Sequence, residues 1–179
     1  MQFNEKYVIF AQKIKDEECA SRRNSTNRYK SYKFCFLNMD LIAEHNKKYD
    51  FFRDITGEAM RVHRKFRYGL LESAYEAALK YLLEEKGYQV ERQVPVPIYW
   101  EDVELDQSYR LDLVVDDNII LELKSMNHID TPQRRQLWNY MNLTHLPYGM
   151  LINFSPDGLY SEWYHRNEQT GVIDKVKLF

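Results

Sequence analysis

The sequence predicts one α/β domain with a mixed β-sheet flanked by helices. The 179 residues are 44% hydrophobic, which suffices for a single full core but is short for two enzymatic units. Stretches with helical periodicity alternate with β-rich runs. Two of these runs are joined by only three turn residues, and the second is followed by a helical stretch and another β-rich run, a pattern typical of α/β folds.

Residues 1–50 are interpreted as an N-terminal extension with a basic centre and partly helical flanks, and residues 51–179 as the folded domain. The basic side chains of the extension are either a phosphate-contacting arm or a tail. We favour a tail, because no groove-reading pattern accompanies the charges. The cations concerned are Arg22, Arg23, Arg28, Lys30 and Lys33.

Two helices open the domain. ITGEAMRVHRKF, residues 55–66, has amphipathic helical spacing and is interrupted by RYG. LLESAYEAALKYLLEEKG is rich in Ala, Leu and Glu and predicts a helix over residues 70–86, with Gly87 as its C-terminal cap.

Three strands are expected next. Residues 88–100 alternate like a strand, but Pro95 and Pro97 each remove an amide donor and favour a sheet edge. The runs YRLDLVV and IILELKS are separated by Asp116, Asp117 and Asn118, residue types that favour a tight hairpin turn.

A helix over residues 132–143 follows, with Thr131 as its N-cap and Pro132 at its first position. YGMLINF then supplies a buried strand, and the strand–helix–strand order places it parallel to IILELKS. The expected order is α-α-β-β-β-α-β, with a weaker last strand in LYSEWYH.

Composition excludes several classes of protein. The net charge is −2 and the pI about 6.2, so the chain is not a globally basic nucleic-acid binder. Cys19 and Cys35 form no CxxC motif, which argues against a zinc or iron–sulfur site. No apolar run reaches the length of a membrane span or resembles a signal peptide, so a cytoplasmic protein without membrane contact is expected.

The hairpin supplies the residues most suited to catalysis. If Val115 pairs with Ile119, Asp112 lies opposite Glu122 on one face, with Lys124 and Arg110 on the same face. A two-residue turn would move Asp112 to the other face. Two neighbouring carboxylates repel each other unless a cation lies between them, and oxygen ligands suit Mg²⁺. The alternative is an exposed cross-strand ion pair between Glu122 and Lys124.

The segments ITGEAMRVHRKFRYGLLESAYEAALKYLLEEKGYQVERQ, YRLDLVVDDNIILELKS and QLWNYMN together resemble the GxxExxY protein family of the PD-(D/E)XK nuclease superfamily. The naming motif stands at Gly69, Glu72 and Tyr75. The resemblance implies a restriction-endonuclease-like fold in which Asp112 and Glu122 bind metal and Lys124 assists the attacking water. Glu72 would complete the acidic set, or it only stabilises the positive end of its helix.

In the wider superfamily a Gln, with a Tyr four residues later, follows the E-x-K strand. Gln136 and Tyr140 match that spacing and would brace the site or touch a phosphate. Tyr75 is a further candidate substrate contact, or it is a core residue with its hydroxyl satisfied. The chain departs from the family before the GxxExxY helix, where a Gly-Pro-Gly-like break is replaced by Phe66, Arg67, Tyr68 and Gly69.

The function expected from the sequence is a Mg²⁺- or Mn²⁺-dependent nuclease acting on phosphodiester bonds, on DNA rather than RNA. The alternative is a nuclease-fold module that binds nucleic acid or protein without turnover, as a homodimer. Metal-dependent cleavage distinguishes the two.

Overall fold

The computed structural model describes residues 50–176, and the basic extension predicted over residues 1–50 lies almost wholly outside them. A helix covers residues 50–66 and is followed by α3 (Glu72–Glu85). The remaining elements are β1 (Val90–Trp100), β2 (Val103–Val115), β3 (Ile119–Lys124), α4 (Thr131–Thr144), β4 (Tyr148–Ser155), β5 (Gly158–Arg166) and β6 (Ile173–Lys175).

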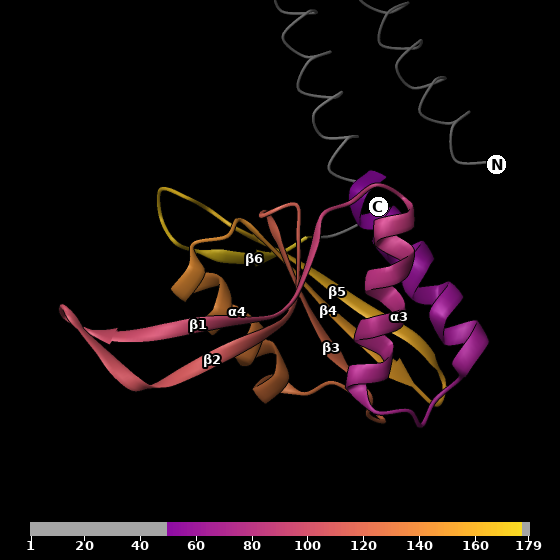
Figure 1. Ribbon diagram of the computed structural model, residues 1–179. Helices are drawn as coiled ribbons and strands as arrows, with labels where there is room; N and C mark the ends of the chain where they lie inside the picture. Colours follow the sequence, from indigo (N-terminus) through magenta and orange to yellow (C-terminus); the bar gives the residue numbers. More distant parts are fainter. Residues whose placement is uncertain (1–49, 177–179) are drawn as a thin grey trace, which may run out of the picture. The chain divides into compact units, whose positions relative to one another are not determined.

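The six strands form one sheet in sequence order, β1-β2-β3-β4-β5-β6, as Figure 1 shows. β3 and β4 are parallel, and every other neighbouring pair is antiparallel. The predicted parallel pair, the hairpin and the edge position of the proline-containing strand are therefore confirmed. The predicted strand over residues 159–165 is β5, which is longer by one residue at each end. The three-residue β6 was not predicted.

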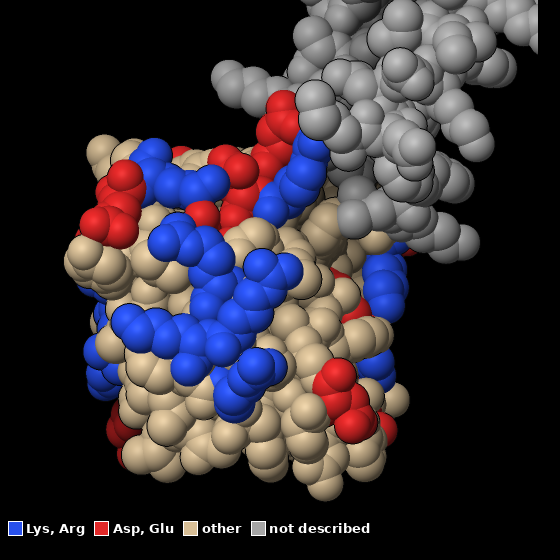
Figure 2. All heavy atoms as spheres, turned by 90° about the vertical axis from the view of Figure 1, so that its right-hand side faces the viewer, with Lys and Arg blue, Asp and Glu red and all other residues tan. Residues whose placement is uncertain are grey.

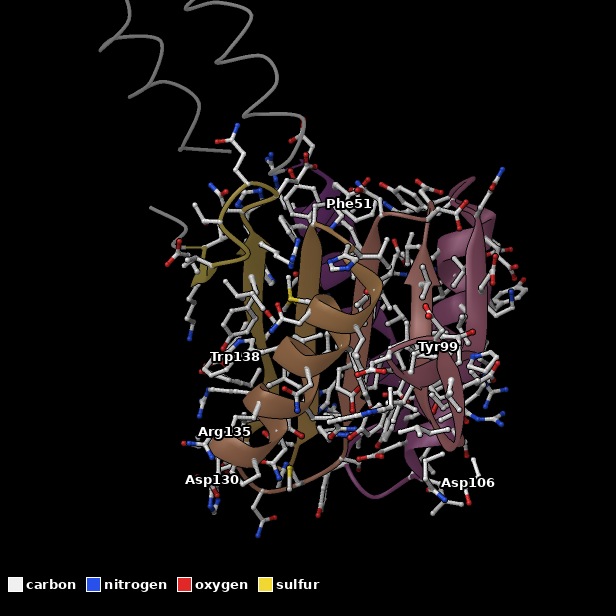
Figure 3. All side chains as sticks on the ribbon, turned by 90° about the vertical axis from the view of Figure 1, so that its left-hand side faces the viewer. Phe51, Tyr99, Asp106, Asp130, Arg135 and Trp138 are labelled. Carbon is white, nitrogen blue, oxygen red and sulfur yellow. The ribbon has the colours of Figure 1, made fainter. Side chains whose placement is uncertain are left out.

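The sheet is covered on both faces, which gives three layers. One face packs against α3 and the helix over residues 50–66, whose buried side chains meet Leu113, Leu121 and Leu123 of the sheet. The other face packs against α4, whose Leu137 and Met141 meet sheet residues such as Ile120. Figure 3 views the side of the molecule that carries α4. The mixed sheet with flanking helices is the predicted α/β, restriction-endonuclease-like architecture.

Helix α4 lies close to the sheet because β4 has a glycine beneath it. A Cβ added at Gly149 would lie 2.5 Å from the sulfur of Met141, so no larger residue fits there without a shift. The helix begins one residue earlier than expected. Asp130, not Thr131, is the N-cap, and its amide donates to Oε1 of Gln133 at 3.0 Å.

None of the helices in the described part of the chain is long and apolar enough to cross a membrane.

Candidate active site

The hairpin turn between β2 and β3 has the predicted length. Val115 pairs with Ile119, and the amide of Asn118 donates to the carbonyl of Val115 at 3.0 Å. Asp116 and Asp117 both have φ of 50°, a conformation that Asp tolerates better than most residues. The turn therefore sets the register on which the candidate site depends.

The side chain of Asp112 lies where β2 and β3 separate. The paired register runs from Val115 and Ile119 to Leu113 and Leu121. Asp112 is the residue before Leu113, and its Oδ2 accepts a hydrogen bond from the amide of Leu123 at 2.8 Å. The side chain thus takes the role that a backbone carbonyl has in an unbroken sheet. This hydrogen bond holds the carboxylate beside Glu122 and Lys124.

Glu122 and Lys124 alternate with the buried leucines of β3, so they face α4. The side chain of Glu122 is only 1% exposed, and its Oε1 accepts a hydrogen bond from Nζ of Lys124 at 2.5 Å. Its other oxygen, Oε2, is buried with no partner among the described residues. A buried carboxylate oxygen without a donor is costly, so the arrangement favours a cation or donor supplied from outside the chain.

Burial dominates the electrostatics of the two carboxylates. It raises the pKa of Asp112 to about 6, although the Leu123 amide and the Lys124 charge act in the opposite direction. Burial, followed by the charge of Asp112, raises the pKa of Glu122 to about 7. Burial alone would lower the pKa of Lys124, but the Glu122 carboxylate outweighs it, and the lysine stays charged.

Glu72 reaches the same end of the sheet from the opposite layer. It is the first residue of α3, is exposed, and its Oε1 accepts a hydrogen bond from the amide of Ser125 at 3.2 Å. Its charge contributes to the raised pKa values of Asp112 and Glu122. The first turn of α3 is therefore joined to the residue that follows Lys124.

Helix α4 contributes an amide and a phenol that are hydrogen-bonded to each other. Nε2 of Gln136 donates to the Tyr140 hydroxyl at 2.8 Å. Tyr140 is buried and its ring contacts Tyr109 of β2, with ring centroids 5.5 Å apart. Burial raises the pKa of Tyr140, and the charges of Glu122 and Asp112 add to this effect. The predicted pair therefore lies within electrostatic reach of the carboxylates.

A family model described as the PD-(D/E)XK nuclease superfamily matches residues 49–166. The chain belongs to the PD-(D/E)XK nuclease superfamily. Nucleases of this superfamily act on nucleic acids and generally use divalent metal ions. No curated protein matches the chain.

Among solved structures, the one titled "Crystal structure of SSO0001" is 18% identical. The similarity covers 87% of this chain and 75% of that one, with a TM-score of 0.40.

Two predicted substrate contacts of the PD-(D/E)XK domain lie elsewhere. Tyr75 is fully buried, stacks on Phe154 at 4.1 Å, and donates its hydroxyl to the carbonyl of Arg67. It is thus the core residue that the sequence left as the alternative. Arg110 is exposed on β2, and no hydrogen bond or ion pair joins it to the carboxylates within residues 50–176. Its neighbour Tyr109 contacts Tyr140 of α4.

Two polar residues on the α4 face of the sheet were not predicted from the sequence. Asn153 pairs with Lys124 across the parallel strands and makes two hydrogen bonds to the main chain of Met126, at 2.9 and 3.1 Å. Glu162 is a buried carboxylate that binds Arg134 of α4. Asn153 interrupts the apolar run of β4, which was the available signal, whereas Glu162 lies among other polar residues of β5 and gave no such signal.

The acidic residues differ in one respect from the expected set of three metal ligands. Within residues 50–176, no three His, Cys, Asp or Glu side chains are close enough together to hold a metal ion. The charge of Asp112 raises the pKa of Glu122, and Oε2 of Glu122 has no partner among the described residues. Glu72 instead binds the amide of Ser125.

Proposed function

We propose that this protein is a nuclease that hydrolyses phosphodiester bonds with a divalent metal, Mg²⁺ or Mn²⁺, and that it is a member of the GxxExxY family. DNA is the expected substrate and the cytoplasm the expected location. The superfamily supports action on nucleic acid, and the carboxylate pair supports metal binding.

The observation that carries the proposal is the state of Glu122. A carboxylate that is 1% exposed, next to a second carboxylate and with one oxygen lacking a partner, is unfavourable in a purely structural core. Such a group favours the binding of a cation, and its raised pKa is typical of a functional site.

The roles follow from position and charge. Asp112 and Glu122 would hold the metal, and Glu72, at the N-terminus of α3, would complete the acidic set. A bound divalent ion supplies positive charge that offsets the charge developing on the phosphate. The ammonium of Lys124 would orient the attacking water or stabilise the phosphate oxygens.

Helix α4 would support the substrate from one side. Gln136 donates to Tyr140 and keeps its amide oxygen and remaining N–H for a phosphate or water. We therefore assign Gln136 to the catalytic set and Tyr140 to substrate contact.

A second function is favoured by a specific observation. The ammonium of Lys124 lies 2.5 Å from Glu122 and neutralises much of its charge without a metal. This ion pair is sufficient for a nuclease-fold module that binds nucleic acid or protein, as a monomer or homodimer, without turnover.

A cleavage panel separates the two functions. Single-stranded, duplex and branched DNA and RNA are incubated with Mg²⁺, with Mn²⁺ and with chelator, alongside the D112N variant. The nuclease proposal expects cleavage that requires metal and Asp112. Absence of cleavage from every substrate, together with no metal-dependent rise in melting temperature, would favour the binding module.

A further inference from the structure

Residues 61–67 carry four exposed cations in a chain whose net charge is negative. No acidic residue occurs between Glu58 and Glu72. Arg61, Arg64, Lys65 and Arg67, here called the basic strip, occupy the end of the helix over residues 50–66 and the residue after it. Figure 2 views this side of the molecule and shows Lys and Arg gathered in one patch, with acidic side chains above it.

Most of the basic strip is not neutralised by the protein. Arg61 forms an ion pair with Glu58 at 2.6 Å. No ion pair or side-chain hydrogen bond holds Arg64, Lys65 or Arg67 within the described residues. By contrast, Arg53 and Lys86 near the acidic end of the same helix are paired with Asp50 and Asp54. Like charges three and four residues apart destabilise a helix slightly, and an anion bound from outside the chain would offset this repulsion.

Two hydrogen bonds hold the basic strip at the end of the strands where the carboxylates lie. His63, between Arg61 and Arg64, is 2.9 Å from the carbonyl of Ser155, the last residue of β4. β4 is parallel to β3, so Ser155 and Lys124 lie at the same end of the two strands. The carbonyl of Arg67 accepts a hydrogen bond from Tyr75 at 2.5 Å. Tyr75 is three residues from Glu72 on α3, so the strip ends about one helical turn from Glu72.

Exposed aromatic side chains accompany the cations. Phe66 is 40% exposed and Tyr68 is 43% exposed. Nζ of Lys65 lies 5.3 Å from the centroid of the Phe66 ring. Cations interleaved with exposed aromatics suit a nucleic-acid strand, because the cations contact phosphates while the rings stack on unpaired bases.

We propose that the basic strip, with Phe66 and Tyr68, binds a single-stranded segment of nucleic acid and leads it to the carboxylates at the end of β3. The proposal rests on the proposed function for the chemistry at the carboxylates, but binding by the strip is measurable without cleavage. The structural alternative is that the cations only stabilise the negative end of their helix.

The test measures the binding of fluorescent single-stranded and duplex oligonucleotides to the full chain, in chelator and over a range of KCl concentrations. The variant R64Q/K65Q is compared with R53Q/K86Q, which removes the same formal charge from the two cations paired with Asp50 and Asp54. A third variant, F66A/Y68A, tests stacking. Thermal melts establish that each variant is folded.

If both cations contact phosphates, R64Q/K65Q reduces the slope of log K against log salt by about 1.4, since each contact on a single strand contributes about 0.7. Relative to 1 M salt, where the two contacts are taken to contribute nothing, this slope corresponds to about a 25-fold loss of affinity at 0.1 M salt. The control should change the slope little, and F66A/Y68A should weaken single-strand binding more than duplex binding.

Equal losses in R64Q/K65Q and R53Q/K86Q would overturn the proposal, as would a melting temperature that falls while binding stays unchanged. Binding through the strip by a protein that never cleaves would refute the proposed nuclease and leave this inference standing. Cleavage that is insensitive to the strip variants would refute this inference and leave the proposed nuclease standing.

Discussion

Oδ2 of Asp112 accepts a hydrogen bond from the amide of Leu123, so the carboxylate that we propose as a metal ligand also closes the gap between two strands. The two roles can be separated by substitution. Asn can retain the hydrogen bond but loses the charge, whereas Ala loses both.

We expect D112N to fold normally and to lose at least about 100-fold in metal-dependent cleavage, because a neutralised ligand weakens the metal site. D112A should also lose about 1–3 kcal/mol of stability, since the buried amide of Leu123 is left without an acceptor. Denaturant unfolding and metal titration measure the two effects. Equal cleavage by D112N and wild type would show that the metal site is placed wrongly.

Substitution of Lys124 should affect turnover instead of metal binding. K124A removes a positive charge beside the metal position, so metal affinity should be unchanged or higher. The rate of the chemical step should fall by about 100-fold or more, because the group that orients water or stabilises phosphate charge is gone. Single-turnover rates at saturating metal measure this. A defect that extra metal fully rescues would contradict the assignment.

The metal-free protein should lose stability as pH rises from about 4 to 7. Asp112 and Glu122 have folded-state pKa values of about 6 and 7, above their ordinary values of 3.8 and 4.5. The folded state therefore binds protons more tightly than the unfolded state, and the resulting stability is present below these ordinary values and is lost as pH rises through the folded ones.

Melting temperatures in chelator across this range measure the effect, and D112N should reduce the loss. D117N, which removes the same charge from the exposed turn, is the matched control. A loss of the same size in D112N and wild type would show that Asp112 is not the source.

Glu162 should be essential for the attachment of α4. Its buried carboxylate binds Arg134 at 2.8 and 3.0 Å and Lys175 at 2.6 Å, and it accepts hydrogen bonds from the hydroxyls of Tyr160 and Tyr164. Although burial opposes it, these partners hold the pKa of Glu162 well below its usual range. E162Q should therefore cost about 3 kcal/mol at neutral pH, as expected when a buried ion pair is broken.

The difference between E162Q and wild type should shrink as pH falls below 4.5, because a lowered folded-state pKa gives stability that is lost on acidification. E168Q, at an exposed turn position, is the control. A pH-independent difference would show that the charge of Glu162 is not what stabilises α4.

A chain without residues 1–48 should fold cooperatively with nearly the melting temperature of the full chain. The helix over residues 50–66 contributes Phe52, Ile55 and Val62 to the core, so the cut must precede it. A chain that begins at residue 67 should be unfolded, because those side chains are lost. Insoluble or molten protein from the chain without residues 1–48 would show that the extension belongs to the core.

Local patterns were sufficient for most of the fold. The three-residue turn set the pairing of Val115 with Ile119, which continues to Leu113 and Leu121, and the two prolines placed β1 at an edge. Tyr75 was ambiguous because helical spacing does not tell a buried phenol from a substrate contact. Asn153 and Glu162 were missed because their partners lie 27 and 28 residues away, in the loop after β3 and on α4, and no local pattern specifies these contacts.

The β1 edge of the sheet resists extension. β1 carries Pro95 and Pro97, which have no amide hydrogen to offer, and Gln93 interrupts the strand with φ of 56°. At the opposite edge, β6 is only three residues long. The proline-containing edge is therefore a poor template for a strand from another molecule, which guards this side of the sheet against edge-to-edge aggregation. A homodimer of this protein would not be built by pairing strands along this part of β1.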